Sequence, residues 1–227
     1  MHALFFLALL AVLVFVPQWW VRRTLARYNR DEWNFPGTGG EFARHLLDHL
    51  DLKDVQVESA GPEGDHYDPT QRVVRLAEDK IERNSLTAIV TAAHEVGHAV
   101  QHRMHYGPFL WRMRIAKLVV VIQRVGSFLL FAVPVLTLVT RMPSVGLITL
   151  LIGLLTMGSA VILQLVTLPV EWDASFTRAQ PILQAGYLRE EQYAAADRIL
   201  KACALTYFAA ALANLLNFWA WLRMVRP

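Results

Sequence analysis

The sequence predicts a mainly α-helical membrane protein with about four transmembrane helices and an α+β domain outside the bilayer. Two observations lead to this expectation: 55% of the 227 residues are hydrophobic, and these residues gather in four long runs. The mean hydropathy of +0.33 also points away from an ordinary soluble domain. Four buried core helices are the alternative, but a chain of this length would have too little polar sequence to cover them.

Residues 1–20 are expected to form an N-terminal transmembrane anchor. The run from Ala3 to Val16 is entirely apolar, and Trp19 and Trp20 follow it as an aromatic belt before two arginines. A cleaved signal peptide is the alternative. The run is not preceded by a basic region, and no small-residue cleavage site follows it, so an uncleaved anchor is favoured.

Residues 21–117 carry most of the charge and are expected to form the domain outside the bilayer. Apolar spacing, alternation and capping residues predict its elements. They are a helix over 41–50, a two-strand element from 55–58 and 72–76, and an apolar helix that Asn84 or Ser85 caps and that extends through Val100. A helix so apolar outside the membrane must be buried in its domain.

The second half of the chain is expected to cross the membrane three times. Residues 118–168 form a hairpin, because the apolar runs 118–140 and 145–168 are separated by only four residues. Residues 169–203 return as a polar segment with helical periodicity, and residues 204–227 form a last transmembrane helix.

The net charge of +3 does not indicate nucleic-acid binding, because the basic residues cluster at the ends of the apolar runs. Twelve of them flank the two polar segments and three lie on the opposite side, which places the polar domain in the cytoplasm and both termini outside. The single cysteine, Cys203, excludes an intramolecular disulfide.

The sequence His94-Glu95-Val96-Gly97-His98 is an H-E-x-x-H motif within the apolar helix. Residues four apart lie on one helix face, so His94 and His98 can bind one zinc ion while Glu95 reaches a water molecule on it. The alternative is a pair of ordinary core histidines. Two imidazoles and a carboxylate without a partner would be unfavourable in an apolar segment, so the metal site is favoured.

A catalytic zinc site needs a third protein ligand and one open position. His102 lies two turns from His94, about 12 Å along the helix, so His102 and His105 are expected to be surface or outer-sphere residues. No acidic residue occurs between Val96 and Val170. Glu171 is therefore the expected ligand and Asp173 the less favoured one, although Glu171 could simply mark a helix start after Pro169.

The segment Gly64-Asp-His-Tyr-Asp-Pro69 leaves two interpretations open. His66 or Tyr67 could donate a hydrogen bond to the oxyanion of a tetrahedral intermediate. Asp65, Asp68 and Pro69 could instead shape a turn, which is the favoured interpretation. The nearby segment 72–76 could offer a strand edge to a substrate chain.

Three segments together resemble the YugP-like family of membrane-embedded neutral zinc metallopeptidases, and more distantly the HtpX-like and CaaX-prenyl-protease gluzincins. They are residues 64–76, 92–101 and 169–175. The resemblance implies a cytosolic zincin-like metalloprotease domain with one Zn²⁺ on His94, His98 and Glu171, and with Glu95 as the catalytic carboxylate. HtpX-like proteins have an aspartate where this chain has Ser175, so Asp173 and Ser175 are both candidates for the outer sphere.

The expected function is that of a zinc-dependent endopeptidase, integral to the bacterial inner (plasma) membrane. It would act on protein or peptide substrates near the cytoplasmic surface, with the lipid bilayer as its other partner and no nucleic acid. A non-catalytic, zinc-stabilised membrane scaffold is the main alternative. A channel or transporter component with a chance motif is less favoured, because few polar residues interrupt the apolar runs.

Overall fold

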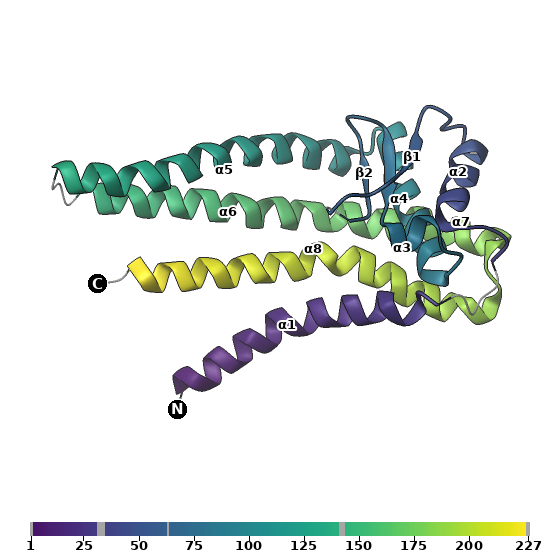
Figure 1. Cartoon of the computed structure of the whole chain (residues 1–227), viewed down its shortest axis with the longest axis horizontal. Helices are drawn as coiled ribbons and strands as arrows, with labels where there is room; N and C mark the ends of the chain where they lie inside the picture. Colours follow the sequence, from purple (N-terminus) through teal and green to yellow (C-terminus); the bar gives the residue numbers. More distant parts are fainter. Residues whose placement is uncertain (1, 31–34, 63, 141–143, 226–227) are drawn as a thin grey trace.

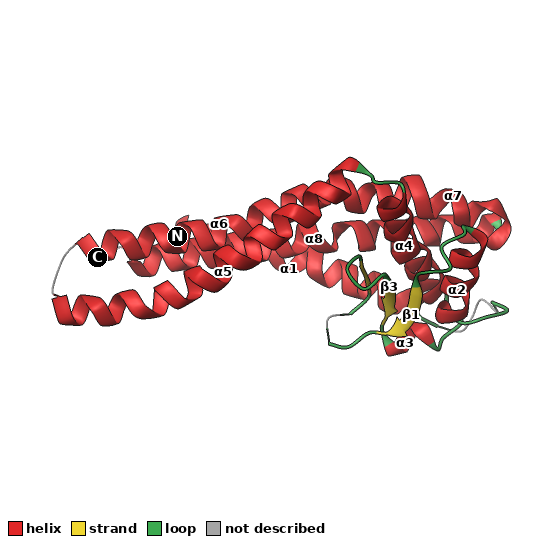
Figure 2. Ribbon diagram, turned by 90° about the horizontal axis from the view of Figure 1, so that it is seen from above, coloured by secondary structure: helices red, strands yellow, loops and turns green. Residues whose placement is uncertain are grey.

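The computed structural model describes residues 2–30, 35–62, 64–140 and 144–225. Four long helices lie side by side and extend from a small domain at one end (Figures 1 and 2). They are α1 (His2–Tyr28), α5 (Gly107–Thr140), α6 (Ser144–Trp172) and α8 (Glu190–Val225). Each contains one of the predicted apolar runs, so the protein is mainly helical with a small sheet, as predicted.

By length and composition, one helical stretch among the described residues qualifies as a membrane span. It is Leu151–Tyr187, with a mean hydropathy of 2.1, and it includes most of the second arm of the predicted hairpin. The crossing of the bilayer by all four helices remains a prediction. The tip of the hairpin, residues 141–143, lies outside the described residues.

Two helices of the small domain begin at residues whose side chains cap them. Thr38 and Glu41 form a reciprocal capping box at the start of α2 (Gly39–His49). Ser85 accepts a hydrogen bond from the backbone N–H of Ala88 at the start of α4 (Leu86–Arg103), which confirms one of the two predicted caps. The short helix α3 (Glu78–Ile81) precedes α4.

The sheet has three strands in the order β1-β3-β2: β1 (Gln56–Ser59), β2 (His66–Asp68) and β3 (Val73–Leu76). The strand β3 pairs with β1 in parallel and with β2 in antiparallel orientation. The prediction of a two-strand element missed β2. The prediction that segment 72–76 offers a free edge was wrong, because β3 is the central strand.

The core of the small domain is built around α4, which contacts α2, the sheet and α8. Almost every residue of α4 from Leu86 to Ala99 is buried, as the apolar sequence predicted. Apolar side chains of all these neighbours form one hydrophobic cluster with it. The H-E-x-x-H motif is therefore held on a helix that is buried in the core of the domain.

The chain remains helical after α6 instead of starting a new helix at Pro169. Pro169 lies inside α6, so the interpretation of Glu171 as a helix start was wrong. A π-helix, η2 (Asp173–Ala179), follows directly, and then come α7 (Gln180–Ile182) and a second π-helical segment, η3 (Leu183–Tyr187). This segment ends where Gly186 adopts a φ of +118°, a conformation that glycine tolerates best, and α8 begins three residues after η3.

Candidate metal centre

Three buried side chains from two helices converge beside the small domain. His94 and His98 come from α4, and Glu171 comes from the last turn of α6. Glu171 Oε2 lies 3.2 Å from His94 Nε2 and 3.3 Å from His98 Nε2. The three possible ligand atoms lie within 4.8 Å of one another, so the group could hold one metal ion.

The distances of Glu171 Oε2 from the two histidine nitrogens fit a tetrahedral zinc site. Zinc binds imidazole nitrogen and carboxylate oxygen at about 2.0 to 2.1 Å, so two ligand atoms on a tetrahedral ion are about 3.3 Å apart. The separations of 3.2 and 3.3 Å match this value. The two rings lie nearly perpendicular, at 78°, with centroids 4.8 Å apart, so their Nε2 atoms approach without stacking.

The hydrogen bonds of Ser175 fix the tautomer of His94. The Ser175 hydroxyl lies 3.0 Å from His94 Nδ1 and 3.2 Å from the backbone carbonyl of Leu200 on α8. Because the hydroxyl has one proton, which it donates to the Leu200 carbonyl, it accepts from Nδ1–H of His94. The lone pair of His94 is thus on Nε2, the atom that faces Glu171.

Gln101 fixes the tautomer of His98 in the same way. The Gln101 amide nitrogen donates to the carbonyl of Val170 at 2.8 Å and to the carboxylate of Asp173 at 2.7 Å. Its oxygen is therefore the atom 2.9 Å from His98 Nδ1, and it accepts from Nδ1–H. Arg178 in turn donates to Asp173 at 3.1 Å. Such partners orient metal-binding histidines and raise their basicity.

An ion pair without metal is the competing explanation of these contacts. With both Nδ1 atoms protonated, donation to Glu171 from Nε2 would make His94 and His98 two imidazolium cations. Arg112 already lies 3.4 Å from Glu171 Oε1, so three cations would surround one buried carboxylate. A divalent cation with neutral imidazoles would bring the same charge, so the distances decide between the two explanations. The separations of 3.2 and 3.3 Å are longer than charge-assisted hydrogen bonds of about 2.7 to 2.9 Å, and they match two ligands on one ion.

Arg112 joins the metal centre to two further helices. It comes from α5, and its guanidinium donates to the Tyr207 hydroxyl of α8 at 3.1 Å and lies over that ring. Glu171 Oε1 is buried and accepts no hydrogen bond from the residues that the structure describes. The contact with Arg112 is thus a charge–charge contact, and it leaves this oxygen able to accept a further bond.

Glu95 lies beside His94 on α4 and is 5% exposed. Burial raises the pKa of Glu95 to about 8; attraction to His94 opposes this effect, and repulsion by Asp65 and Glu171 adds to it. A divalent cation nearby would favour the ionised carboxylate. A carboxyl group whose pKa lies near neutral pH can exchange a proton there, so Glu95 remains the candidate for that role.

Gly97 allows α4 to lie close to the π-helix η2. A Cβ atom at this position would lie 2.8 Å from the carbonyl oxygen of Ala174 and 3.3 Å from Cβ of Arg178. The contact brings the backbone that carries Asp173 and Ser175 against the helix that carries the histidines. The glycine inside the motif thus allows η2, the segment that follows Glu171, to pack closely against α4.

Comparison with known proteins adds a family to this geometry. The model of a family described as "Putative neutral zinc metallopeptidase" matches residues 3–226. The chain belongs to this family. The chain is also 40% identical, over 204 residues, to the protein named "Putative membrane protease YugP" of Bacillus subtilis (strain 168). The match covers 89% of this chain and 87% of that protein, whereas no solved structure matches the chain.

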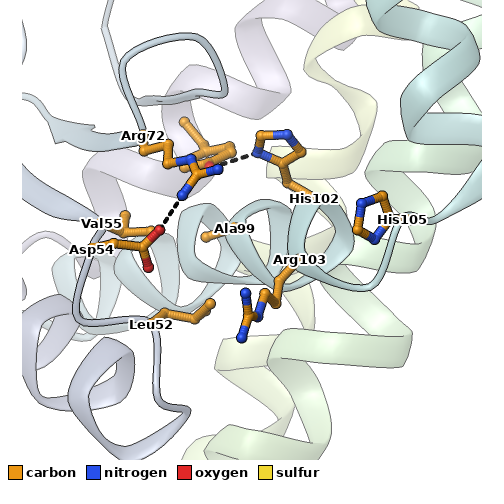
Figure 3. Close-up of a pocket in the computed structure, with 9 residues that line it drawn as sticks. Leu52, Asp54, Val55, Arg72, Ala99, His102, Arg103 and His105 are labelled. Atoms are coloured by element: carbon orange, nitrogen blue, oxygen red, sulfur yellow. Dashed lines mark hydrogen bonds and ion pairs between the residues drawn. The ribbon is translucent and has the colours of Figure 1, made fainter.

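His102 and His105, at and just after the end of α4, lie apart from the candidate metal group. His102 and His105 line a hollow of about 90 Å³ that Asp54 and Arg72 also line (Figure 3). The Tyr67 hydroxyl lies 2.9 Å from His102 Nδ1. Burial, reinforced by Arg72, lowers the pKa of His102, which favours the neutral ring. Neither histidine belongs to the metal group, in agreement with the prediction.

The structure gives local partners to the residues of segment 64–69. Asp68 accepts from the backbone N–H groups of Thr70 and Gln71, so it shapes the turn after β2, as the favoured interpretation predicted. Asp65 accepts from the N–H of Ala77 and pairs with Lys80 at 3.0 Å. His66 Nδ1 lies 2.9 Å from the Gly64 carbonyl. An oxyanion role for His66 or Tyr67 remains a prediction.

Sequence analysis missed two residues that contact the candidate metal group, Gln101 and Arg112. Gln101 had a usable signal, because it follows His98 by three residues and therefore lies on the same helix face. Arg112 had none, because a basic residue just before an apolar run is already explained by membrane topology. Its approach to Glu171 depends on how α5 packs on α6.

Proposed function

We propose that the chain is a membrane-embedded, zinc-dependent endopeptidase of the gluzincin type. The observation that carries the proposal is the buried group of His94, His98 and Glu171. Glu171 Oε2 lies as far from each Nε2 atom as two ligands on a tetrahedral ion, and both Nδ1 atoms are hydrogen-bonded to other side chains. Imidazole and carboxylate ligands favour zinc among the common divalent metals. Three protein ligands leave one position open, as catalytic sites require.

Bound zinc would supply a Lewis acid that polarises the scissile carbonyl and lowers the pKa of a water molecule. The chain's own residues do the rest. Glu95 accepts a proton from the attacking water and delivers it to the leaving amine. The Arg112 guanidinium holds Glu171 from the other side and is placed to donate to substrate oxygen.

A hollow of about 240 Å³ provides a path for the substrate. Phe109, Arg112 and Met113 line it together with residues of the turn after β2. At Phe109 the hollow comes close to the metal centre, since the ring centroids of Phe109 and His98 are 6.2 Å apart. The hollow also reaches Lys117, directly before the long apolar run begins. A peptide in this hollow would be cut close to the membrane surface.

The membrane placement rests on the four long helices and on their flanking charges. We propose an anchor over 1–20, a hairpin over 118–168 and a last span over 204–227, with the segments 21–117 and 169–203 in the cytoplasm. Because the hairpin crosses the bilayer twice, it returns Glu171 to the side that holds His94. The proposed substrates are protein chains at the cytoplasmic surface of the membrane.

Loss of activity without loss of metal tests the proposal. The full chain, reconstituted in proteoliposomes with zinc, is expected to cleave an unfolded model protein. Glu95→Gln should retain zinc and lose at least about 10²-fold in rate, because it removes the proton acceptor. His94→Ala should lose the zinc as well, as measured by metal analysis. Cleavage by Glu95→Gln at the wild-type rate would overturn the mechanism.

The zinc-stabilised scaffold is the second candidate, and X-ray absorption separates it from the peptidase. A structural site would have four protein ligands and no exchangeable one. The peptidase should show two imidazole nitrogens, one carboxylate and one small exchangeable oxygen ligand.

A further inference from the structure

A second hollow, of about 300 Å³, lies between α1 and α8. It begins at the level where the apolar run of α1 ends. Its lining is aromatic and basic: Trp19, Trp20, Arg23, Thr24, Arg27, Tyr28 and Arg198. None of these residues is acidic, and none belongs to the metal centre.

Three guanidinium groups line this hollow, two from α1 and one from α8. Arg23 lies over the Trp19 ring at 5.0 Å, and Arg27 lies over the Tyr28 ring at 5.7 Å. Arg198 of α8 donates to the Tyr28 hydroxyl at 3.1 Å. Within the described part of the chain, these three arginines form no ion pair with a carboxylate. Their mutual repulsion would be relieved by an anion in the hollow.

The surroundings indicate that the anion belongs to a lipid. Trp19 is 57% exposed and stands at the end of the apolar run, where aromatic residues mark the membrane interface. One turn earlier, Phe15 and Val16 are also exposed, at 65% and 49%. A phospholipid could therefore place its phosphate between the arginines and its acyl chains along these apolar side chains. Free phosphate would use only the basic half of the site.

We propose that this hollow binds the phosphate headgroup of an anionic phospholipid and that the lipid ties α1 to α8. The site requires α1 to be in the bilayer, but it does not require peptidase activity, so it goes beyond the proposed function. It also has a route to the metal centre. Arg198 lies two residues before Leu200, whose carbonyl accepts the hydrogen bond from Ser175 behind His94.

The test compares two double variants that remove the same charge. Arg23→Gln/Arg198→Gln changes the hollow. Arg22→Gln/Arg114→Gln is the matched control, since Arg22 is an exposed neighbour on α1 and Arg114 lies over Trp111 as Arg23 lies over Trp19. Neither control residue lines the hollow. Binding of phosphatidylglycerol to the full chain in detergent is measured by native mass spectrometry and by the shift in melting temperature, with phosphatidylcholine and inorganic phosphate as the other probes.

Wild type and control are expected to retain phosphatidylglycerol, whereas the hollow variant should lose about fivefold in affinity for each charge removed. Arg27→Gln, a single exposed change, gives the same readout if the double variant folds poorly, and zinc content reports folding. Equal losses in control and hollow variants would show a diffuse surface attraction and overturn the site. An equal shift with inorganic phosphate would overturn the lipid assignment.

Discussion

At the residue scale, the candidate metal centre depends on which imidazole nitrogens carry protons. The Nδ1–H groups of His94 and His98 donate to Ser175 and Gln101, which leaves both Nε2 atoms free to bind an ion. Sequence spacing was sufficient to predict His94 and His98, because one helix face fixes their distance. Glu171 was predictable because no acidic residue occurs between Val96 and Val170 and Glu171 is the first one after that stretch, with Asp173 as the less favoured alternative. What the sequence does not contain is the direction of each ring, which Ser175 and Gln101 set through contacts across helices.

Removing the Ser175 hydroxyl should weaken zinc binding without unfolding the protein. In Ser175→Ala, Nδ1–H of His94 loses its acceptor, so the ring can turn or change tautomer. Changes to such partners cost about 10 to 100-fold in metal affinity. A competition titration with a zinc chelator measures the change.

The matched control for this experiment is Ser159→Ala. Ser159 is also buried, and its hydroxyl donates to the Thr156 carbonyl at 2.8 Å within α6, away from the metal centre. Zinc affinity in the control should equal that of the wild type. If Ser175→Ala bound zinc as tightly as the control, the hydrogen bond would have no part in orienting His94.

At the element scale, the helices follow from apolar periodicity and caps, but two features do not. The central position of β3 depends on which strands pair. Pairing between strands from separate segments leaves no local pattern in the sequence. The π-helix after Glu171 depends on a shift in backbone hydrogen bonding that side-chain spacing does not encode. It matters because it carries both Asp173 and Ser175 to the histidines.

The contact between α4 and η2 can be tested at Gly97. In Gly97→Ala, the new methyl group would lie 2.8 Å from the Ala174 carbonyl oxygen, so the two backbones must separate. We expect a destabilisation of about 1 to 3 kcal/mol and a loss of zinc affinity, because the outer partners of both histidines move with η2. Melting temperature and metal content measure the two effects.

Gly158→Ala in α6 is the control, because a Cβ atom there meets nothing within 4 Å. An alanine inside a helix should leave stability unchanged or raise it by up to about 1 kcal/mol. A Gly97→Ala protein as stable and as metal-rich as this control would contradict the proposed close approach.

The turn after β2 should make the domain sensitive to acid. Partial burial acts to raise the pKa of Asp68, but two backbone N–H groups and the Arg75 guanidinium outweigh it and hold this pKa below its usual value. A carboxyl group with a lowered folded pKa stabilises the fold above the unfolded pKa of about 3.9, and this contribution disappears as the pH falls through the folded value. The free energy of unfolding, measured from about pH 6 downwards, should therefore fall more steeply with acid in wild type than in Asp68→Asn.

At neutral pH, Asp68→Asn should lose on the order of 1 kcal/mol, since a charge-assisted hydrogen bond is replaced by weaker ones. Asp48→Asn on α2 is the comparison, because its side chain is 54% exposed and lies outside the turn. An identical change in the acid limb of both variants would assign the effect to general charge, not to the turn.

At the scale of the whole molecule, the candidate metal group joins α4, which precedes the hairpin of α5 and α6, to the last turn of α6. Hydropathy predicted the long helices, and an even number of expected crossings predicted that Glu171 returns to the histidines. The lateral order of the helices could not be predicted, because apolar faces that meet lipid and apolar faces that meet helices have the same composition. That order decides that Arg112 and Tyr207 meet beside Glu171.

The proposed orientation can be measured with cysteines introduced into a Cys203→Ala background. Position 53 lies in the small domain and position 189 lies just before α8, and both residues are exposed. Position 144 begins α6 at the far end of the hairpin. Because basic residues favour the cytoplasmic side, a membrane-impermeant maleimide added to intact cells should label position 144 and spare positions 53 and 189. Inverted vesicles should give the reverse pattern.

Labelling of position 53 in intact cells would place the metal centre outside the cell. Labelling of positions 144 and 53 from the same side would show that the hairpin does not cross the bilayer.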